Sequence, residues 1–212
     1  MLYILYMYPI PLIKSLLEKR EIEYNGKKYK IHSNIKLDEG MVLYNLIIQH
    51  NLKHTLEIGM ATGISSLFIG SAIKQIDGNH IAIDPFQSTQ WENLGMMNIR
   101  KAGLEKYISL IEQKSYIALP ALLLKHKFNL IFIDGWHTFD YTLVDFFYSD
   151  LMLHVGGYII IDDILHKGVS KFTKYLLSNY KHYEEVKTNS RTIIVVKKIR
   201  EDDRKWYFHK EF

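Results

Sequence analysis

The sequence predicts an α/β fold in which a mostly parallel sheet is covered by helices on both faces. From residue 54 onward, short apolar segments alternate with segments of helical periodicity, which is the pattern of repeated strand and helix units. Residues 130–133 and 158–161 are apolar throughout, as is typical of strands buried on both faces. The last two predicted strands are joined by the short polar segment 188–191, so they are expected to be antiparallel.

The composition fits one compact domain with a full hydrophobic core. The chain has 212 residues, of which 48% are hydrophobic and 24% are charged. Its formal net charge is +4, and the lysines are scattered along the chain, which argues against a nucleic-acid groove without excluding one. The absence of cysteine excludes disulfides, thiolate chemistry and cysteine-based zinc sites, and it fits a reducing, cytoplasmic location.

Residues 1–37 are predicted to form an N-terminal extension. The apolar segment 1–13 lacks a leading basic region and a cleavage site, is too short to span a bilayer, and contains Pro9 and Pro11. We expect it to pack on the domain or on a partner subunit, which favours a homodimer and no membrane contact. A short helix is expected at residues 13–19. The dipeptide Asn25-Gly26 predicts a β-hairpin over residues 21–31.

The following residues are predicted to form the main domain, 38–200, and an aromatic tail, 201–212. Asp38 is expected to cap a helix that ends before Asn51. Seven strands are then expected, at residues 54–58, 79–83, 106–111, 129–133, 157–161, 183–187 and 192–199. Helices are expected at about residues 63–75, 91–102, 115–126, 139–152 and 168–180. We expect the tail to pack on a neighbour or to act as a lid, unless it is only a frayed terminus.

The turn after the first of these strands is the strongest indication of a binding site. Gly59 lets the chain leave the strand in a conformation closed to other residues, and Gly63 is expected to let a ligand approach the next helix. The glycines are spaced G-x-x-x-G, whereas a dinucleotide fingerprint is G-x-G-x-x-G. Glu57 beside the turn would repel a pyrophosphate and suit a cationic ligand. These features argue against a nicotinamide dehydrogenase.

Acidic residues follow three other predicted strands. Asp84 ends one strand, where a carboxylate can accept hydrogen bonds from both ribose hydroxyls. Asp134 ends a second strand, and Asp162 and Asp163 end a third. Because neighbouring strands lie about 4.8 Å apart, the last three carboxylates are expected at one edge of a pocket. Such crowding is costly without a cation. His137 follows Asp134 by three residues at the mouth of this pocket.

Several motifs in this order resemble class I S-adenosylmethionine-dependent methyltransferases. They are the E-x-G-x-x-x-G of residues 57–63, the DPFQSTQW of residues 84–91, and the I-D-G-x-H group that begins at Ile133. Within that class the chain is similar to metal-dependent O-methyltransferases that act on catechols, caffeoyl groups and sugars. The resemblance covers residues 38–198. It implies a Rossmann-like, seven-stranded, mostly parallel sheet whose last strand is antiparallel.

The resemblance also implies roles for individual residues. Those implied to bind S-adenosylmethionine are Glu57, Gly59, Thr62, Gly63, Ser65, Asp84, Ser115 and Asp134. Asp134, Asp162 and Asp163 are implied to hold Mg²⁺ or Mn²⁺, both of which accept oxygen ligands. A metal-free enzyme that uses these aspartates for hydrogen bonds is the alternative.

Two residues depart from the pattern of the catechol enzymes. Those enzymes carry asparagine at the position of Asp163 and a lysine base at the position of His137. We therefore predict that His137 is the general base, since an unperturbed histidine is mostly neutral at physiological pH. The alternative is that His137 caps the helix beginning near Phe139 or binds the cofactor.

The functional hypothesis is O-methylation of a small hydroxylated molecule, a sugar or a phenolic compound. Methylation of nucleic acid or protein is one alternative, which the absence of a clustered basic face and of an added recognition domain disfavours. A non-catalytic binding subunit with the same fold is another. Such a subunit is expected to lose the acidic positions, yet all of them are present.

Overall fold

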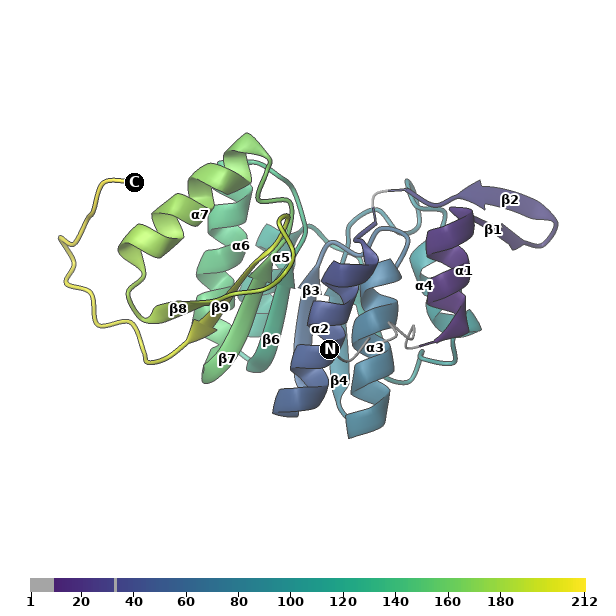
Figure 1. Ribbon diagram of the computed structural model, residues 1–212, viewed down its shortest axis with the longest axis horizontal. Helices are drawn as coiled ribbons and strands as arrows, with labels where there is room; N and C mark the ends of the chain where they lie inside the picture. Colours follow the sequence, from purple (N-terminus) through teal and green to yellow (C-terminus); the bar gives the residue numbers. More distant parts are fainter. Residues whose placement is uncertain (1–9, 33) are drawn as a thin grey trace, which may run out of the picture.

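The computed structural model describes residues 10–32 and 34–212. Its main element is a seven-stranded sheet with the spatial order β5-β4-β3-β6-β7-β9-β8 (Figure 1). The strands are β3 (His54–Ile58), β4 (Asn79–Ile83), β5 (Ile108–Ile111), β6 (Phe128–Ile133), β7 (Leu153–Ile161), β8 (Tyr183–Val186) and β9 (Ile194–Lys198). The first five are parallel, and β9 runs antiparallel to both β7 and β8. The predicted fold class is therefore confirmed.

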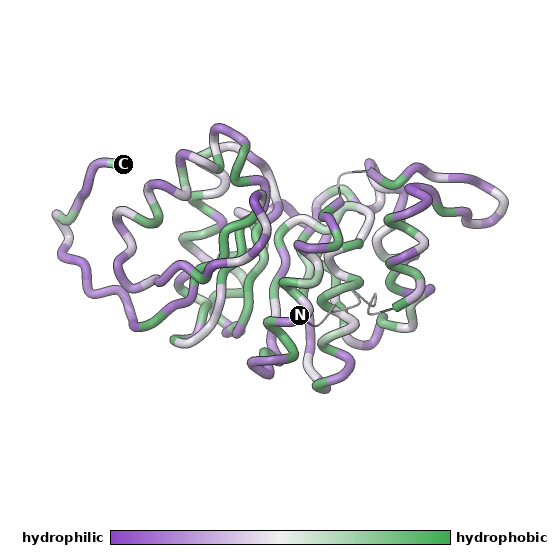
Figure 2. The backbone as a smooth tube through the Cα atoms, in the orientation of Figure 1, coloured by the Kyte–Doolittle hydropathy of each residue, from purple (hydrophilic) through white to green (hydrophobic). Residues whose placement is uncertain are grey.

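Helices cover both faces of this sheet. They are α1 (Pro11–Lys19), α2 (Leu37–His50), α3 (Ile64–Ile76), α4 (Leu94–Lys101), α5 (Ser115–Leu123), α6 (Phe139–Met152) and α7 (Lys167–Asn179). The first four share one apolar cluster with one face of the sheet, and α5 to α7 share a second cluster with the other face. Apolar residues accordingly gather between the layers (Figure 2). Within the described ranges, no helix is long and apolar enough to cross a membrane.

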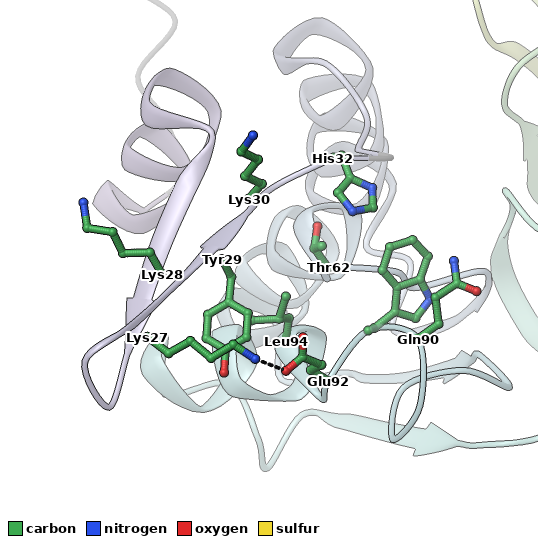
Figure 3. Close-up of a pocket in the computed structure, with 10 residues that line it drawn as sticks. Lys27, Lys28, Tyr29, Lys30, His32, Thr62, Gln90, Glu92 and Leu94 are labelled. Carbon is green, nitrogen blue, oxygen red and sulfur yellow. Dashed lines mark hydrogen bonds and ion pairs between the residues drawn. The ribbon is translucent and has the colours of Figure 1, made fainter.

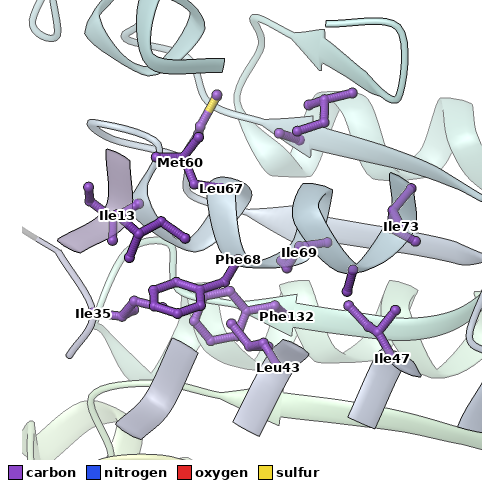
Figure 4. Close-up of a cluster of buried hydrophobic side chains, with 14 of the residues drawn as sticks. Ile13, Ile35, Leu43, Ile47, Met60, Leu67, Phe68, Ile69, Ile73 and Phe132 are labelled. Atoms are coloured by element: carbon purple, nitrogen blue, oxygen red, sulfur yellow. The ribbon is translucent and has the colours of Figure 1, made fainter. Parts of the chain in front are cut away.

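The first cluster is centred on the packing of α2 and α3 against the sheet. Phe68 of α3 and Phe132 of β6 are almost completely buried beside Leu43 of α2 (Figure 4). The absence of a side chain at Gly40 allows this arrangement, because a Cβ there would collide with the Phe68 ring. Full burial of such side chains stabilises the fold by about 1.5–3 kcal/mol each.

The N-terminal extension packs onto the same cluster. Ile13 and Leu16 of α1 are buried in this cluster. Ile22, in the first strand of the hairpin, and Ile31, directly after its second strand, are buried there too. The hairpin consists of β1 (Glu21–Tyr24) and β2 (Lys27–Lys30), and both residues of its Asn25-Gly26 turn have positive φ, which confirms the predicted turn. The expected packing of the apolar segment falls mostly on residues 1–9, which lie outside the described residues.

Several predicted boundaries were wrong, among them the ends of the segments predicted at 106–111, 115–126 and 192–199, and three others have clear local reasons. Lys36 precedes the first residue of α2, so Asp38 lies inside the helix, and Glu39 instead accepts the Lys36 backbone N–H at 2.6 Å. The helix expected from residue 91 begins at Leu94, because Glu92 and Asn93 have positive φ. The strand expected from residue 157 begins at Leu153, and the glycine pair forms an irregularity within it.

The C-terminal tail returns to α7. The backbone of Lys210 donates to and accepts from the side-chain amide of Asn179, with both distances at 2.8 Å. Phe212 stacks on Phe139, and the Arg204 guanidinium lies 3.7 Å from the ring centroid of Tyr180. These tail residues therefore contact the domain itself, and packing on a neighbour or action as a lid stays a prediction.

Candidate active site

The register of the sheet brings the predicted site residues together. Ile58 of β3 is paired with Ile83 of β4 and with Ile133 of β6, and Ile133 is paired with Ile161 of β7. The four residues that follow these partners therefore lie side by side beyond the carboxyl edge of the sheet. They are Gly59, Asp84, Asp134 and Asp162. Ligands of open α/β sheets bind at this edge.

A cavity of about 1120 Å³ lies above this edge. Eight of the predicted site residues line it: Gly59, Ser65, Asp84, Ser115, Asp134, His137, Asp162 and Asp163. Ser65 belongs to the first turn of α3 and Ser115 is the first residue of α5. The segment after the hairpin also lines the cavity, through residues that include Ile35 and Lys36. The volume of the cavity slightly exceeds the usual range for small-molecule sites, about 300–1,000 Å³.

The carboxylate of Asp84 holds the glycine turn in place. Its Oδ2 accepts the backbone N–H groups of Met60 at 3.1 Å and Ala61 at 2.7 Å, and its Oδ1 accepts the N–H of Phe86 at 2.8 Å. Ala61 has a φ of 47°, which is uncommon for a residue with a side chain, and its hydrogen bond to Asp84 supports this conformation. Asp84 thus shapes the cavity floor as well as lining it.

Glu57 does not line the cavity, and its contact with a cationic ligand stays a prediction. Its side chain is fully buried beneath the turn, where it accepts a hydrogen bond from Ser66 and lies 3.2 Å from His80 Nε2. Its Oε1 has no hydrogen-bond partner among the described residues. Glu57 therefore acts from inside the fold, as a buried negative charge below the site.

Gly63 and Thr62 are also absent from the lining of this cavity, and their contacts with the cofactor stay predictions. Gly63 has a φ of 81°, and a Cβ there would lie 3.0 Å from the Cα of Gly95. The glycine therefore permits close packing of α3 against α4, and Gly63 is absent from the cavity lining. Gly59 is required for a comparable reason, because a Cβ there would collide with the carbonyl oxygen of Asp134. Thr62 lines a separate, smaller hollow beneath the hairpin.

The carboxylates at the ends of β6 and β7 repel one another. Burial, together with the charges of Asp163 and Glu57, raises the pKa of Asp134 well above its ordinary value. Burial, followed by the charges of Asp134 and Glu39, raises the pKa of Asp162 to about 8. A cation at this end of the cavity would relieve both effects, so the donor set fits a hard divalent ion.

Two histidines meet Asp163 at the same end. The Nε2 atom of His137 lies 3.2 Å from Asp163 Oδ2 and 3.4 Å from Asp134 Oδ1. The ring centroids of His166 and His137 lie 5.0 Å apart. The Nε2 atom of His166 lies 3.9 Å from Asp163 Oδ1. His137, Asp163 and His166 offer ligand atoms within 4.8 Å of one another. A metal could therefore be held by these three groups as well as by the predicted aspartates.

Three further residues near the cavity were not identified from the sequence. His166 lies three residues after Asp163, and that spacing was its only signal. Glu39 is brought to the cavity by α2, and it accepts a hydrogen bond from the Thr192 hydroxyl. Gln87 is buried and donates to the carbonyl of Ala61 at 2.7 Å. Glu39 depends on packing between distant segments and no local pattern indicates it, whereas Gln87 lies within the DPFQSTQW motif, which did not show that its side chain reaches the glycine turn.

Comparison with known proteins agrees with this geometry. A family model described as a methyltransferase domain matches residues 56–164. A flavonoid 3',5'-methyltransferase of Vitis vinifera is 33% identical over 158 residues, which are 70% of this chain and 63% of that protein. A caffeoyl-CoA O-methyltransferase of Populus kitakamiensis is 31% identical over 154 residues, which are 69% of this chain and 63% of that protein. The chain thus spans less than two thirds of the length of these relatives.

Solved structures share the fold at lower sequence identity. A methyltransferase of Podospora anserina with bound S-adenosylhomocysteine superposes with a TM-score of 0.73 and 14% identity, over 90% of this chain and 89% of that chain. An O-methyltransferase of Bacillus cereus in complex with S-adenosylhomocysteine gives a TM-score of 0.67 and 16% identity, over 78% of this chain and 83% of that chain.

Proposed function

This chain belongs to the methyltransferase-domain family, and on that premise we propose that it transfers a methyl group from S-adenosylmethionine to a hydroxyl group of a small molecule. The observation that carries the proposal is the row of carboxylates beneath one large cavity, at the strand ends where ligands of this fold bind. A sulfonium donor is cationic, and an acidic floor suits it. The named O-methyltransferases among the relatives support oxygen as the acceptor atom.

The reaction requires the acceptor oxygen and the sulfonium methyl group to be held in line. The oxygen forms a bond to the methyl carbon as the carbon–sulfur bond breaks, and the hydroxyl proton must leave the oxygen. The turn at Gly59 and the carboxylate of Asp84 position the donor, and His137 lies where it can take the proton. Positioning of this kind supplies a large part of the rate of a two-substrate reaction.

A divalent ion fits the end of the cavity formed by β6 and β7. Asp134, Asp162 and Asp163 would bind the ion through their carboxylate oxygens. In the second donor set, ring nitrogens of His137 and His166 would bind it together with a carboxylate oxygen of Asp163. When bound, such an ion lowers the pKa of a coordinated hydroxyl and helps to orient it. The same acidic residues, with no ion, would bind the acceptor by hydrogen bonds.

We also propose that the methyl acceptor is a phenolic compound or a sugar. A homodimer and a cytoplasmic location stay predictions, as do the domain boundaries at residues 37 and 200.

Calorimetry with S-adenosylhomocysteine tests the donor. We expect binding to the wild type and none with NAD, because the turn lacks the glycine spacing that a pyrophosphate needs. Asp84→Asn should weaken binding by the worth of one or two charged hydrogen bonds, about 1.5–3 kcal/mol each. Asp203→Asn, which changes an exposed carboxylate in the tail, is the matched control.

Transfer of a labelled methyl group to catechols and sugars then separates an enzyme from a binding subunit. Preferential binding of NAD would overturn the proposed function. Binding of S-adenosylhomocysteine without turnover of any hydroxylated acceptor would favour the non-catalytic alternative.

A further inference from the structure

The glycine turn that lines the cavity needs support from its surroundings. Ala61 and Gly63, on either side of Thr62, both have positive φ, and Ala61 belongs to the cavity lining. A residue with a side chain keeps this conformation only where neighbouring contacts fix it. The carboxylate of Asp84 holds N–H groups of the turn, so the carbonyl groups of Ala61 and Thr62 depend on other partners.

Side chains of α4 and of the loop before it hold these two carbonyl groups. Asn98 of α4 donates from Nδ2 to the Thr62 carbonyl at 2.8 Å, and Gln87 donates to the Ala61 carbonyl at 2.7 Å. Both side chains are fully buried. Gly95 allows α4 to come this close, because a Cβ there would lie 2.9 Å from the Ala61 carbonyl oxygen. The conformation of the turn therefore depends on the position of α4.

The N-terminal hairpin is in turn attached to α4. The hydroxyl of Tyr24 in β1 donates to Asn98 Oδ1 at 2.8 Å, and the Lys101 ammonium of α4 lies 5.2 Å from the centroid of the Tyr24 ring. Lys27 of β2 forms an ion pair of 2.5 Å with Glu92, which lies just before α4 (Figure 3). Three contacts thus join the hairpin to α4 and to the loop that precedes it.

Asn98 is the residue at which these two sets of contacts meet. Its amide accepts a hydrogen bond from the hairpin and donates one to the turn, and asparagine suits this position because its planar amide carries both an acceptor and donors. Burial raises the pKa of Tyr24 to about 12, so its hydroxyl keeps the proton that it donates. Tyr24, Asn98 and Thr62 therefore form a continuous hydrogen-bonded path from the hairpin to the turn.

We propose that Asn98 is a positioning residue for the methyl donor and that Tyr24 acts through it. The inference rests on the proposed function, because it takes the glycine turn to bind S-adenosylmethionine. Neither side chain lines the cavity, so both act through the backbone of Thr62 and of its neighbour Ala61. The hairpin thereby supports the site of the methyl donor, although it forms a sheet of its own.

Calorimetry with S-adenosylhomocysteine measures the effect of this path on affinity. Asn98→Leu keeps a side chain of similar size and should raise Kd by roughly 10-fold, because it leaves the buried Thr62 carbonyl without a donor. Tyr24→Phe removes one hydroxyl and should raise Kd by roughly 2- to 5-fold. Tyr29→Phe, which removes a hydroxyl from the other strand of the hairpin, is the matched control and should leave Kd unchanged. An unchanged Kd in Asn98→Leu would overturn the proposal.

The double variant tests whether Tyr24 acts through Asn98. If it does, Tyr24→Phe should have no further effect on Kd in a protein that already carries Asn98→Leu. In steady-state kinetics the KM for S-adenosylmethionine should rise in Asn98→Leu while kcat at saturation stays the same, because the turn holds the methyl donor and contacts no reacting atom. Additive effects on Kd, or a lower kcat with an unchanged KM, would contradict the proposal.

Hydrogen exchange of the ligand-free protein gives a readout that does not require the methyl donor. Asn98→Leu should speed exchange in residues 59–64 and leave residues 128–133 of β6 protected. Unchanged exchange at the turn, or faster exchange in both segments, would overturn the positioning role. Tyr24→Phe provides the same test if Asn98→Leu does not fold. If S-adenosylhomocysteine does not bind the wild type, the proposed function fails, and this measurement still decides whether Asn98 holds the turn.

Discussion

The position of His137 is compatible with several roles. Its Nε2 atom lies between carboxylate oxygens of Asp134 and Asp163, and its side chain is about one third exposed to the cavity. A histidine held in this way can accept a proton from a hydroxyl and pass it to a neighbouring carboxylate. The same nitrogen could instead bind a metal together with His166. His137 was also predicted as a possible cap, but Thr138 is the residue at the cap position of α6, and its side chain makes no capping hydrogen bond.

The substitution His137→Ala separates these roles. If His137 is the base, kcat should fall by roughly 10²–10⁴ while affinity for S-adenosylhomocysteine is preserved. Steady-state kinetics measures the first effect and calorimetry measures the second. His209→Ala, in the exposed tail, is the control and should leave the rate unchanged.

A different outcome would identify His137 as a metal ligand. In that case added Mn²⁺ would restore much of the rate, and His166→Ala would show the same requirement. Loss of affinity for S-adenosylhomocysteine with an unchanged kcat would contradict the role as a base and make His137 a cofactor-binding residue.

At the scale of secondary-structure elements, the acidic end of the site forms where the carboxyl ends of β6 and β7 lie side by side. The pairing of Ile133 with Ile161 places Asp134 beside Asp162, so two acidic loops leave the sheet together. The backbone of Asp163 has a φ of 55°, a conformation in which aspartate and asparagine are enriched. The N–H of Asp163 donates to Asp162 Oδ1 at 2.7 Å, which shapes this corner.

Divalent ions should stabilise the folded protein through these strand ends. At a concentration of a hundred times Kd, Mg²⁺ or Mn²⁺ should raise the melting temperature by about 5–10 °C, which corresponds to about 2.7 kcal/mol in a domain of this size. The rise should be small in Asp134→Asn/Asp162→Asn. Thermal denaturation with and without a chelator measures it.

His166→Ala distinguishes the two donor sets. A site made of the three aspartates should keep its response to Mg²⁺ in that variant, whereas a site made of His137, Asp163 and His166 should lose it. An undiminished response in the double variant would place the ion elsewhere. If the wild type shows no response and keeps full activity in chelator, the enzyme is metal-free.

At the scale of the whole molecule, a buried polar network joins α6 to the far edge of the sheet. Asp150 Oδ1 accepts a hydrogen bond from the Tyr183 hydroxyl at 2.8 Å and lies 3.3 Å from Lys198 Nζ and 3.4 Å from His182 Nε2. The other ring nitrogen of His182 lies 3.6 Å from Asp202 in the tail. Burial tends to raise the pKa of Asp150, but the contacts with His182, Tyr183 and Lys198 lower it below its ordinary value.

This network should make stability sensitive to acid. Because the pKa of Asp150 is lower in the folded state, its stabilising effect is present above about pH 4 and is lost as the pH falls through the lowered value. Asp150→Asn should reduce the free energy of unfolding by about 1.5–3 kcal/mol at pH 7, the worth of a charged hydrogen bond, since it removes the carboxylate that accepts from Tyr183 while Lys198 keeps its ion pair with Glu201. It should also weaken the dependence on pH below 4.

Urea denaturation at pH 7, 4 and 3 measures this effect. Asp203→Asn is the matched control, because Asp203 pairs with Arg200 at an exposed site and should change stability little. Equal stability of Asp150→Asn and the wild type at pH 7 would contradict a stabilising role of the network.

The architecture, and eight of the residues that line the cavity, could be predicted from the sequence alone. Strands 54–58 and 79–83 were predicted at their observed bounds, because short segments rich in apolar residues and flanked by turn residues such as Gly59 and Gly78 are local signals. The order of the strands then places the residues after them at one edge, so Asp84, Asp134 and Asp162 could be grouped in advance. Element ends were less accurate, because caps and bulges depend on single backbone angles.

Only the tertiary structure decided which way each of these side chains faces and what it meets. Glu57 lies on β3 beside the turn, yet contacts with Ser66 and His80 hold it inside the fold. Gly63 faces Gly95, about thirty residues further along the chain, and this makes its role one of packing. Such contacts join segments that are distant in sequence and are set by the packing of whole helices against the sheet. A periodic pattern identifies the buried face of an element, but it does not specify the partner that the face will meet.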